Sequence, residues 1–255
     1  MIGGASAILS EVDARGVATI TFDRPEKSNA LDAGMRRRFS AELLRFAGDP
    51  TVRLLIVRGA GKHFSAGADV GSFGTETPEE RVECLLRLEA FPKPTVALVQ
   101  GACVGAALGV VACCDIVVAA TDGLFSIPEV RLGLPPLGLA PLFLRALGAQ
   151  AFRRYALTGE RFDSAEALRL GLVHQVCAPE ALAAHAAKLA DELLQAAPGA
   201  IAELKRTARG LSSPGIAEEI VRLAREERQH LESREAKEGI AAFREKRSPS
   251  WVPKK

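Results

Sequence analysis

Lys62-His63-Phe64-Ser65-Ala66-Gly67-Ala68-Asp69-Val70 forms a loop at the end of a predicted buried strand. The strand is the apolar run Leu54-Leu55-Ile56-Val57, and the turn residues 58–61 join it to the loop. Side chains around Gly67 are small, so backbone amides stay uncovered and a ligand carbonyl can approach them closely. Enzymes stabilise a developing oxyanion with amides of this kind. The loop is therefore a candidate oxyanion-binding site, with an ordinary strand–helix turn as the alternative.

Strands and helices alternate around this loop. Residues 7–12 and 17–22 form a hairpin-like pair, and the apolar runs 95–99 and 116–120 predict two more buried strands. The spacing of apolar residues predicts helices between these strands, at 32–46, 78–91 and 105–113. This alternation indicates an α/β fold class with a largely parallel core.

The pattern changes after residue 142 and becomes mostly helical. A single strand is expected in this part, at 172–176. We therefore predict an α/β core over residues 1–195 and a helical C-terminal region over 196–255. The helices expected after residue 142 are 142–158, 164–170, 179–196, 199–211, 216–231 and 235–246.

The composition excludes several classes of function. The net charge of +2 argues neither for nor against nucleic acid, but the aromatic fraction of 5% leaves little for base stacking, so no nucleic-acid partner is expected. No apolar run is long enough to span a membrane, and Met1–Ala5 lacks the basic start of a signal peptide. We expect a cytoplasmic protein that does not bind a membrane.

The metal-binding residue types are scattered. The five cysteines contain no CxxC pattern and mostly lie in apolar runs, so we expect reduced core residues. The histidines have no spacing that suits a metal, so no metal site is expected; they are His63, His174, His185 and His230.

Two further loops contain candidate catalytic groups. Gly101-Ala102-Cys103-Val104-Gly105-Ala106-Ala107 also leaves a buried strand, and it enters a helix through small residues. Free amides at a helix N-terminus favour a developing negative charge, although small residues also serve close packing. The segment 126–134 places one acid, Glu129, among apolar neighbours, and burial would raise its pKa toward acid–base work. A solvated loop acid is the alternative for Glu129.

Taken together, these segments resemble the enoyl-CoA hydratase/isomerase (crotonase) superfamily. The matching segments occur in the order and spacing of that family and span almost the whole chain. They are residues 24–31 (RPEKSNAL), 63–69 (HFSAGAD), Gly101 with Gly105-Ala106, 112–116 (ACCDI), Pro128-Glu129 with Leu132-Gly133, 157–159 (LTG), 171–173 (GLV) and 242–247 (AFREKR).

The resemblance implies a spiral of ββα units with a helical C-terminal region that forms a homotrimer or a dimer of trimers. It implies an acyl-CoA thioester substrate, with coenzyme A as part of the substrate and no separate cofactor. The thioester oxygen would lie between the backbone amides of Ala68 and Ala106. Glu129 would be the acid or base.

The resemblance also implies a path for coenzyme A. The adenine and pantetheine would lie along the loop residues, and the C-terminal helix would close over them. Asp69 lies on this path and is expected to be a structural or capping carboxylate rather than a catalytic one. The basic run 36–38 is expected to be a solvated helix face, with CoA phosphates as the alternative partner. The residues implied in binding are Lys27, Ala30, Ala66, Asp69, Val70, Phe243 and Lys246.

The chain departs from this family at one chemical position. Two-acid hydratases of the family carry a second carboxylate where this chain has Gly109, and no acid lies between Gly101 and Asp115. A hydratase with Glu129 as its single acid/base residue is expected. The alternatives are a Δ3,Δ2-enoyl-CoA isomerase and a non-catalytic protein that binds CoA thioesters. A looser similarity points to methylglutaconyl-CoA hydratase-like bacterial members.

Overall fold

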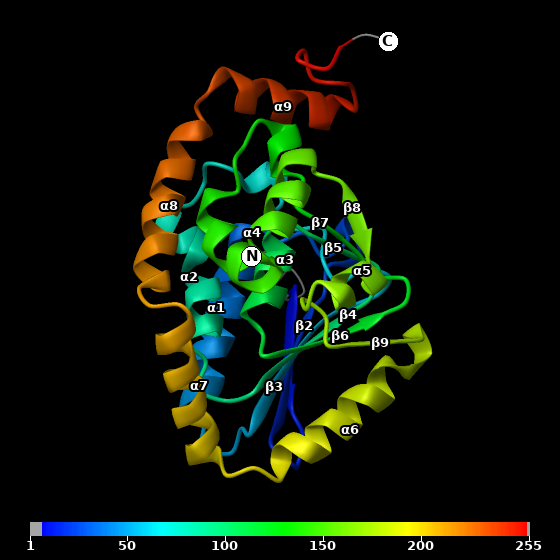
Figure 1. Cartoon of the computed structure of the whole chain (residues 1–255), viewed down its shortest axis with the longest axis vertical. Coiled ribbons are helices and arrows are strands. Elements are labelled where there is room, and N and C mark those ends of the chain that lie inside the picture. The colour runs from blue at the N-terminus through cyan, green and yellow to red at the C-terminus, as the bar shows by residue number, and fades with distance from the viewer. Residues whose placement is uncertain (1–6, 254–255) are drawn as a thin grey trace, which may run out of the picture.

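The structure, a computed structural model, describes residues 7–253 and consists of two β-sheets surrounded by helices (Figure 1). The expectation that there is no signal peptide rests on Met1–Ala5, and this segment lies outside the described residues. The larger sheet has six strands and the smaller sheet has three. The mixed architecture confirms the predicted α/β class.

The larger sheet has the strand order β1-β2-β3-β4-β6-β9. β1 pairs antiparallel with β2, and every later pair in this sheet is parallel. The predicted hairpin and the largely parallel core are therefore confirmed. The strands are β1 (Ile8–Val12), β2 (Val17–Phe22), β3 (Leu54–Gly59), β4 (Thr95–Val99), β6 (Ile116–Ala120) and β9 (Gln175–Cys177).

The smaller sheet is not predicted by the sequence. It consists of three-residue strands, too short to show an alternating pattern, and β5 lies inside the loop expected at 101–107. The strand expected at 172–176 is also shorter than predicted and begins at Gln175, although Leu172 and Val173 are buried in the core. The three strands are β5 (Ala102–Val104), β7 (Leu124–Ser126) and β8 (Arg161–Asp163).

The predicted helices are present, with shifts of one to three residues at most of their ends. Their starts follow from capping residues: Asp32 accepts a hydrogen bond from the amide of Met35, and Thr77 and Glu80 form a capping box. The helices are α1 (Ala33–Gly48), α2 (Pro78–Glu89), α3 (Ala106–Cys113), α4 (Ala140–Thr158), α5 (Ser164–Arg169), α6 (Leu182–Leu194), α7 (Pro198–Ser212), α8 (Ile216–His230) and α9 (Arg234–Glu245).

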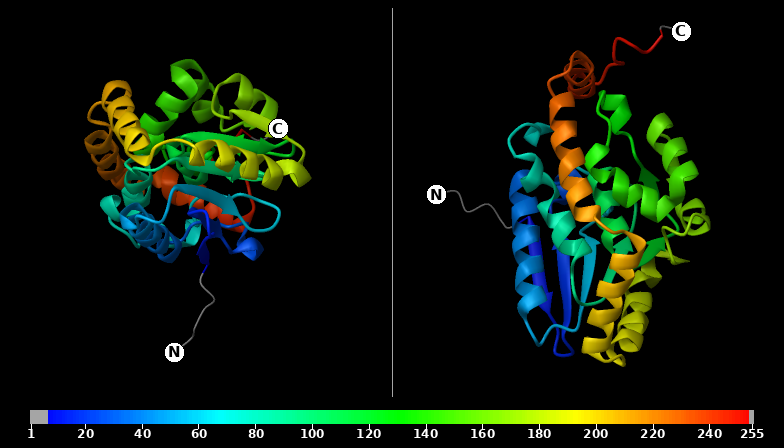
Figure 2. Two further views of the ribbon diagram at one scale, coloured as in Figure 1. Left: turned by 90° about the horizontal axis from the view of Figure 1, so that it is seen from below. Right: turned by 60° about the vertical axis from the view of Figure 1, so that its left-hand side comes forward.

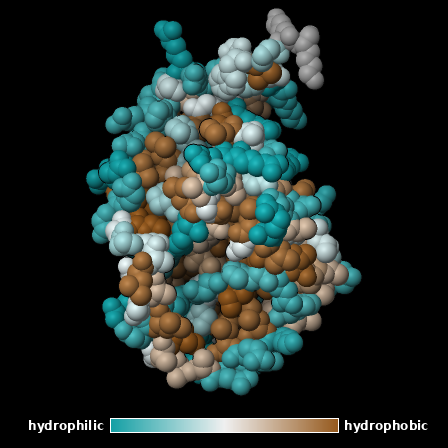
Figure 3. All heavy atoms as spheres, in the orientation of Figure 1, coloured by the Kyte–Doolittle hydropathy of each residue, from teal (hydrophilic) through white to brown (hydrophobic). Residues whose placement is uncertain are grey.

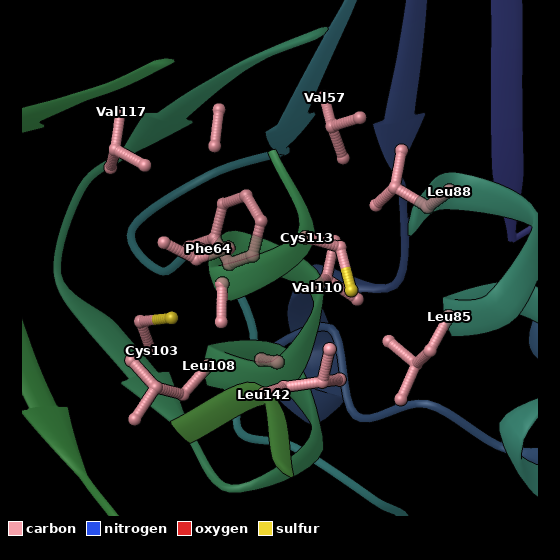
Figure 4. Close-up of a cluster of buried hydrophobic side chains, with 14 of the residues drawn as sticks. Val57, Phe64, Leu85, Leu88, Cys103, Leu108, Val110, Cys113, Val117 and Leu142 are labelled. Atoms are coloured by element: carbon pink, nitrogen blue, oxygen red, sulfur yellow. The ribbon is translucent and has the colours of Figure 1, made fainter. Parts of the chain in front are cut away.

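The larger sheet separates two clusters of buried apolar side chains, one on each of its faces. One face packs against helices that include α1, α2 and α3, and Figure 4 shows Phe64 and Val110 within this cluster. The other face is covered by α6, which packs through Ala186 and Ala190. Figure 2 shows the sheet between these helical layers and α8 along one side. The cavity described below lies on the side of α2, α3 and α8.

Apolar side chains are also exposed on two helices of the C-terminal half. Leu144 and Leu157 on α4 and Leu204 and Leu211 on α7 are between 42% and 80% exposed. Figure 3 shows brown, hydrophobic atoms on the lower half of the face that carries α6 and α7. The homotrimer or dimer of trimers stays a prediction, as does the division of the chain at residue 195. Within residues 7–253, no helix is long and apolar enough to cross a membrane.

Candidate active site

A cavity of about 580 Å³ brings together loops that are far apart in the sequence. Its walls come from the loop at 66–73, the start of α3, helices α2, α8 and α9, and two short 3-10 segments, η3 (Glu129–Leu132) and η4 (Leu137–Leu139). Most of the lining is apolar, with a few charged groups. The lining residues used below are Ala68, Ala106, Glu129, Arg81 and Glu227.

The loop of residues 62–70 is held by a buried amide. The side-chain nitrogen of Asn29 donates hydrogen bonds to the carbonyls of Ala60, His63 and Phe64, at 2.8 to 3.2 Å. The hydroxyl of Ser65 donates in turn to the carbonyl of Asn29 at 2.7 Å. The polar groups of this buried amide are hydrogen-bonded, and these bonds hold the loop in place. The role of the segment 24–31 is therefore to fix the loop that follows β3.

The two glycine-containing loops run side by side. The amide of Ser65 donates to the carbonyl of Ala102 at 3.0 Å, and the amide of Val104 donates to the carbonyl of Ser65 at 3.1 Å. Gly67, at φ +88°, lies so close to the carbonyl of Val104 that a Cβ atom would overlap it. The same Cβ position would be 3.6 Å from the amide nitrogen of Ala106. Sequence-distant amides are thus brought together at one edge of the cavity.

Two backbone amides on this edge are free to bind a ligand. Ala106 is the first residue of α3, so its N–H has no acceptor within the helix. The β-bridge between Ala68 and Leu31 uses the carbonyl of Gly67 and the amide of Asp69, so the N–H of Ala68 is not part of it. Among the described residues, neither amide donates to a protein acceptor. The geometry fits the predicted oxyanion hole.

Glu129 places an unsatisfied carboxyl group beside these amides. It begins η3, and its Oε2 atom is buried with no hydrogen-bond partner among the described residues. Burial, and then the negative charge of Glu227, raises the pKa of Glu129 from 4.5 to about 7. A carboxyl group with a pKa near neutrality can both accept and deliver a proton.

Asp69 has a structural position at the mouth of the cavity. Its side chain accepts a hydrogen bond from the amide of Gly71 at 2.9 Å and another from Arg24 at 2.8 Å. Burial pushes the pKa of Asp69 upward, but these two donors outweigh burial and the pKa is lowered. Asp69 is thus the N-terminal cap of the 3-10 segment Val70–Ser72, as a capping role predicts.

The residues predicted to bind coenzyme A divide into two groups. Phe243 lines the cavity and is 60% exposed, whereas Lys246 ends α9 in a left-handed conformation and does not line the cavity. Arg244 lines it instead, and donates a hydrogen bond to the carbonyl of Val70 at 3.2 Å. The other predicted residues that line the cavity are Lys27, Ala30, Ala66, Asp69 and Val70. Their contact with coenzyme A stays a prediction.

The prediction that residues 36–38 form a solvated face is wrong for Arg36. Its guanidinium is buried against Glu76, and it donates a hydrogen bond to the carbonyl of Leu31 at 2.6 Å. Arg37 and Arg38 are exposed, as expected. A buried cation requires a partner, and Glu76 provides it from the loop before α2.

Two charged residues of the cavity are not found by the sequence reasoning. Glu227 on α8 follows Ile220 and Ala224, both buried, at helical spacing, so it belongs to the buried face of an amphipathic helix. An acid on such a face is the signal that would have identified it. Arg81 on α2 donates to Glu227 at 3.3 Å.

The rings of His63 and His174 take part in structural hydrogen bonds. The ring of His63 accepts from the amide of Ala102 at 3.1 Å, and the ring of His174 accepts from the amide of Val117 at 3.0 Å. Within residues 7–253, no cluster of three His, Cys, Asp or Glu side chains is arranged to hold a metal ion.

The chain is similar over almost its whole length to known proteins. The family model for enoyl-CoA hydratase/isomerase matches residues 13–254. A putative enoyl-CoA hydratase of Thermus thermophilus is 32% identical, over 94% of this chain and 99% of the relative. A carnitinyl-CoA dehydratase of Citrobacter koseri is 35% identical, over 92% of this chain and 94% of the relative.

Solved structures show the same fold. An enoyl-CoA hydratase/isomerase from Pseudoalteromonas atlantica matches with a TM-score of 0.89 and 29% identity, over 96% of this chain and 100% of the other. An enoyl-CoA hydratase from Mycobacterium avium subsp. paratuberculosis matches with a TM-score of 0.90 and 27% identity, over 98% and 100%. The crotonase-type fold is therefore confirmed. The chain belongs to the enoyl-CoA hydratase/isomerase family, whose members act on acyl-CoA thioesters.

Proposed function

We propose that this protein is an acyl-CoA hydratase (a hydro-lyase), which adds water across the double bond of a 2-enoyl-CoA. The observation that carries the proposal is the placement of the unpartnered Glu129 carboxyl on the same cavity as the free amides of Ala68 and Ala106. The names of similar proteins agree with this class of reaction, since a carnitinyl-CoA dehydratase removes water, which is the reverse of hydration.

The reaction follows from these three groups. The thioester oxygen accepts hydrogen bonds from the amides of Ala68 and Ala106, and this polarises the conjugated double bond. The ionised carboxyl of Glu129 takes a proton from water as the water oxygen bonds to the β-carbon. The electron pair of the double bond moves to the thioester oxygen and forms an enolate, which the two amides stabilise. Glu129 then delivers its proton to the α-carbon.

The path of the CoA moiety is part of the proposal. Lys27, Ala30, Ala66 and Val70 line the cavity, as does Phe243 from α9. The apolar lining made by Val82, Leu85 and Leu134 suits an acyl chain.

A second candidate is a Δ3,Δ2-enoyl-CoA isomerase. It is favoured by Gly109, because one carboxyl group suffices to move a proton along an acyl chain. A Cβ atom at this position would be 3.0 Å from Leu139 and 3.6 Å from Leu85, so residue 109 faces apolar side chains of η4 and α2. A third candidate is a protein that binds CoA thioesters without chemistry.

A panel of 2-enoyl-CoA and 3-enoyl-CoA substrates separates these candidates. A 3-hydroxyacyl-CoA product from 2-enoyl-CoA supports the hydratase, whereas interconversion of the two enoyl forms without water uptake would support the isomerase. Binding without reaction would support the third candidate. Glu129→Gln is expected to abolish turnover with little loss of thioester binding, and normal turnover in this variant would remove Glu129 from the mechanism.

A further inference from the structure

A second carboxyl group reaches the cavity from an element that the reaction above does not use. Glu227 on α8 lines the cavity, and its side chain is only 12% exposed. The remaining acid of the lining, Asp69, is engaged at the mouth by Arg24 and Gly71. Glu227 and Glu129 are therefore the two carboxyl groups available inside.

Glu227 is fixed in its orientation from two sides. Its Oε2 atom accepts a hydrogen bond from the amide of Gly138 at 2.9 Å, and its Oε1 atom accepts one from Arg81 at 3.3 Å. The guanidinium of Arg81 also lies 5.5 Å from the ring centre of Phe73. These donors stabilise a charged carboxylate, and an ionised carboxylate has further acceptor sites on both oxygens. Those sites remain for a molecule in the cavity.

Glu227 is held close to the segment that faces residue 109, the position at which α3 lacks an acid. A side chain at residue 109 would meet Leu139, and Leu139 follows Gly138, whose amide holds Glu227. The charge of Glu227 also acts on Glu129, because it is among the causes that raise the pKa of Glu129 after burial. The same cavity thus has a carboxylate supplied by α8 and no carboxylate supplied by α3.

Resting on the hydratase activity proposed above, we propose that Glu227 accepts a hydrogen bond from the water that adds to the β-carbon. One hydrogen of this water passes to Glu129 and then to the α-carbon. The other hydrogen points to Glu227 and stays on the oxygen, which becomes the β-hydroxyl of the product. Glu227 keeps its charge throughout and gains no proton. The residue positions water and afterwards binds the product hydroxyl.

The experiment compares two reactions of the same enzyme. Water addition to a 2-enoyl-CoA needs both carboxylates, whereas exchange of the α-proton of a saturated acyl-CoA in deuterium oxide needs Glu129 and the amides alone. In Glu227→Gln, kcat for hydration should fall at least about tenfold, while most of the exchange rate is retained. Both are measured on the high-pH plateau of each variant. Glu226→Gln is the matched control, because Glu226 is the adjacent residue, 49% exposed and paired with Arg222.

Each outcome decides the role of Glu227. An equal fall of hydration and exchange would make Glu227 a structural residue and overturn the proposal, as would unchanged hydration. A wild-type enzyme that exchanges protons but adds no water would refute the hydratase activity itself, and with it this role. Glu227→Asp, which keeps the charge but withdraws the oxygens, gives the same comparison should the Gln variant fail to fold.

Binding provides a measurement that does not depend on turnover. Wild-type protein should prefer a 3-hydroxyacyl-CoA to the saturated acyl-CoA of equal length, because only the former donates to Glu227. Glu227→Gln should reduce this preference by roughly tenfold or more, the effect of one hydrogen bond to a charged group. An unchanged preference would contradict the proposal.

Discussion

The carboxyl group of Glu129 lies against Gly105, in the space where any other residue would carry its Cβ atom. Gly105 has φ +53° and precedes Ala106, the first residue of α3. One glycine therefore leaves room for the proposed acid and turns the backbone so that the proposed amide faces the cavity. The positions of the acid and the amide depend on each other through this residue.

Gly105→Ala is expected to inactivate the enzyme. The new methyl group would displace the Glu129 carboxyl, and a displacement of about 1 Å costs roughly 100-fold in rate. The left-handed backbone adds a loss of about 1 to 3 kcal/mol in stability. Gly148→Ala is the control, because Gly148 has φ +74° with nothing within 4 Å of a Cβ atom. It should lose stability but not activity. Equal activity losses in both variants would argue against the Glu129 contact.

Ala106→Pro removes one proposed oxyanion donor. Proline is tolerated at the first position of a helix, so α3 should form while the N–H is lost. We expect kcat to fall roughly 100- to 1000-fold. Arg234→Pro makes the same change at the exposed first residue of α9 and should retain activity. A kcat within a few-fold of wild type in a folded Ala106→Pro protein would exclude this amide from catalysis.

The pH profile should report the titration of Glu129. Its carboxylate form takes the proton from water, so kcat/KM should rise with pH and level off above an inflection near pH 7. Measuring kcat/KM with a 2-enoyl-CoA between about pH 5 and about pH 9 tests this expectation. An inflection near pH 4.5, the ordinary value for a glutamate, would show that Glu129 is not held in the buried environment described here.

The same titration has a consequence for stability. Because the pKa of folded Glu129 lies above its unfolded value of 4.5, the folded protein binds this proton more tightly than the unfolded chain. The stabilisation is complete below about pH 4.5 and is lost as the pH rises through about 7. Glu129→Gln should therefore gain roughly 2 to 3 kcal/mol relative to wild type between about pH 5 and about pH 8. Urea unfolding measures the difference in the free energy of unfolding between Glu129→Gln and wild type. A difference that does not change with pH would contradict this expectation.

Restoring an acid on α3 should not improve the enzyme. Gly109→Asp would place a carboxyl group against Leu85 and Leu139, at a cost of about 2 kcal/mol or more in stability. Gly109→Ala, which adds only the Cβ, should cost less because the end of Leu139 can move. Thermal unfolding and hydration rates measure both effects. A stable Gly109→Asp variant with faster hydration would show that the site needs its second acid on α3.

The main strands and both loops of the proposed oxyanion hole are predictable from the sequence because their signals are local. β3, β4 and β6 are continuous apolar runs, and the loops around Gly67 and Gly105 are recognised by their small residues. The strands β5, β7 and β8 have three residues each and exist because neighbouring segments pair with them. No window of sequence contains that information.

The residues of the site that the sequence does not reveal also depend on partners that are distant in the sequence. Arg36 is buried because Glu76, 40 residues away, pairs with it, and Glu227 enters the cavity because Arg81 and Gly138 hold it there. A single charge on a helix is usually a solvated residue, and only the tertiary partners show otherwise. The resemblance to a family segment predicts Lys246 in the site, whereas the end of α9 brings Phe243 and Arg244 to the cavity instead.

The most direct test of the proposed reaction is incubation of a short 2-enoyl-CoA with the wild-type enzyme in water labelled with oxygen-18. Hydration through Glu129 and the two amides predicts a 3-hydroxyacyl-CoA that carries one heavy oxygen, detected by mass spectrometry, and no such product with Glu129→Gln. A 3-enoyl-CoA product without the heavy oxygen, or no product at all while the thioester binds, would contradict the hydratase account.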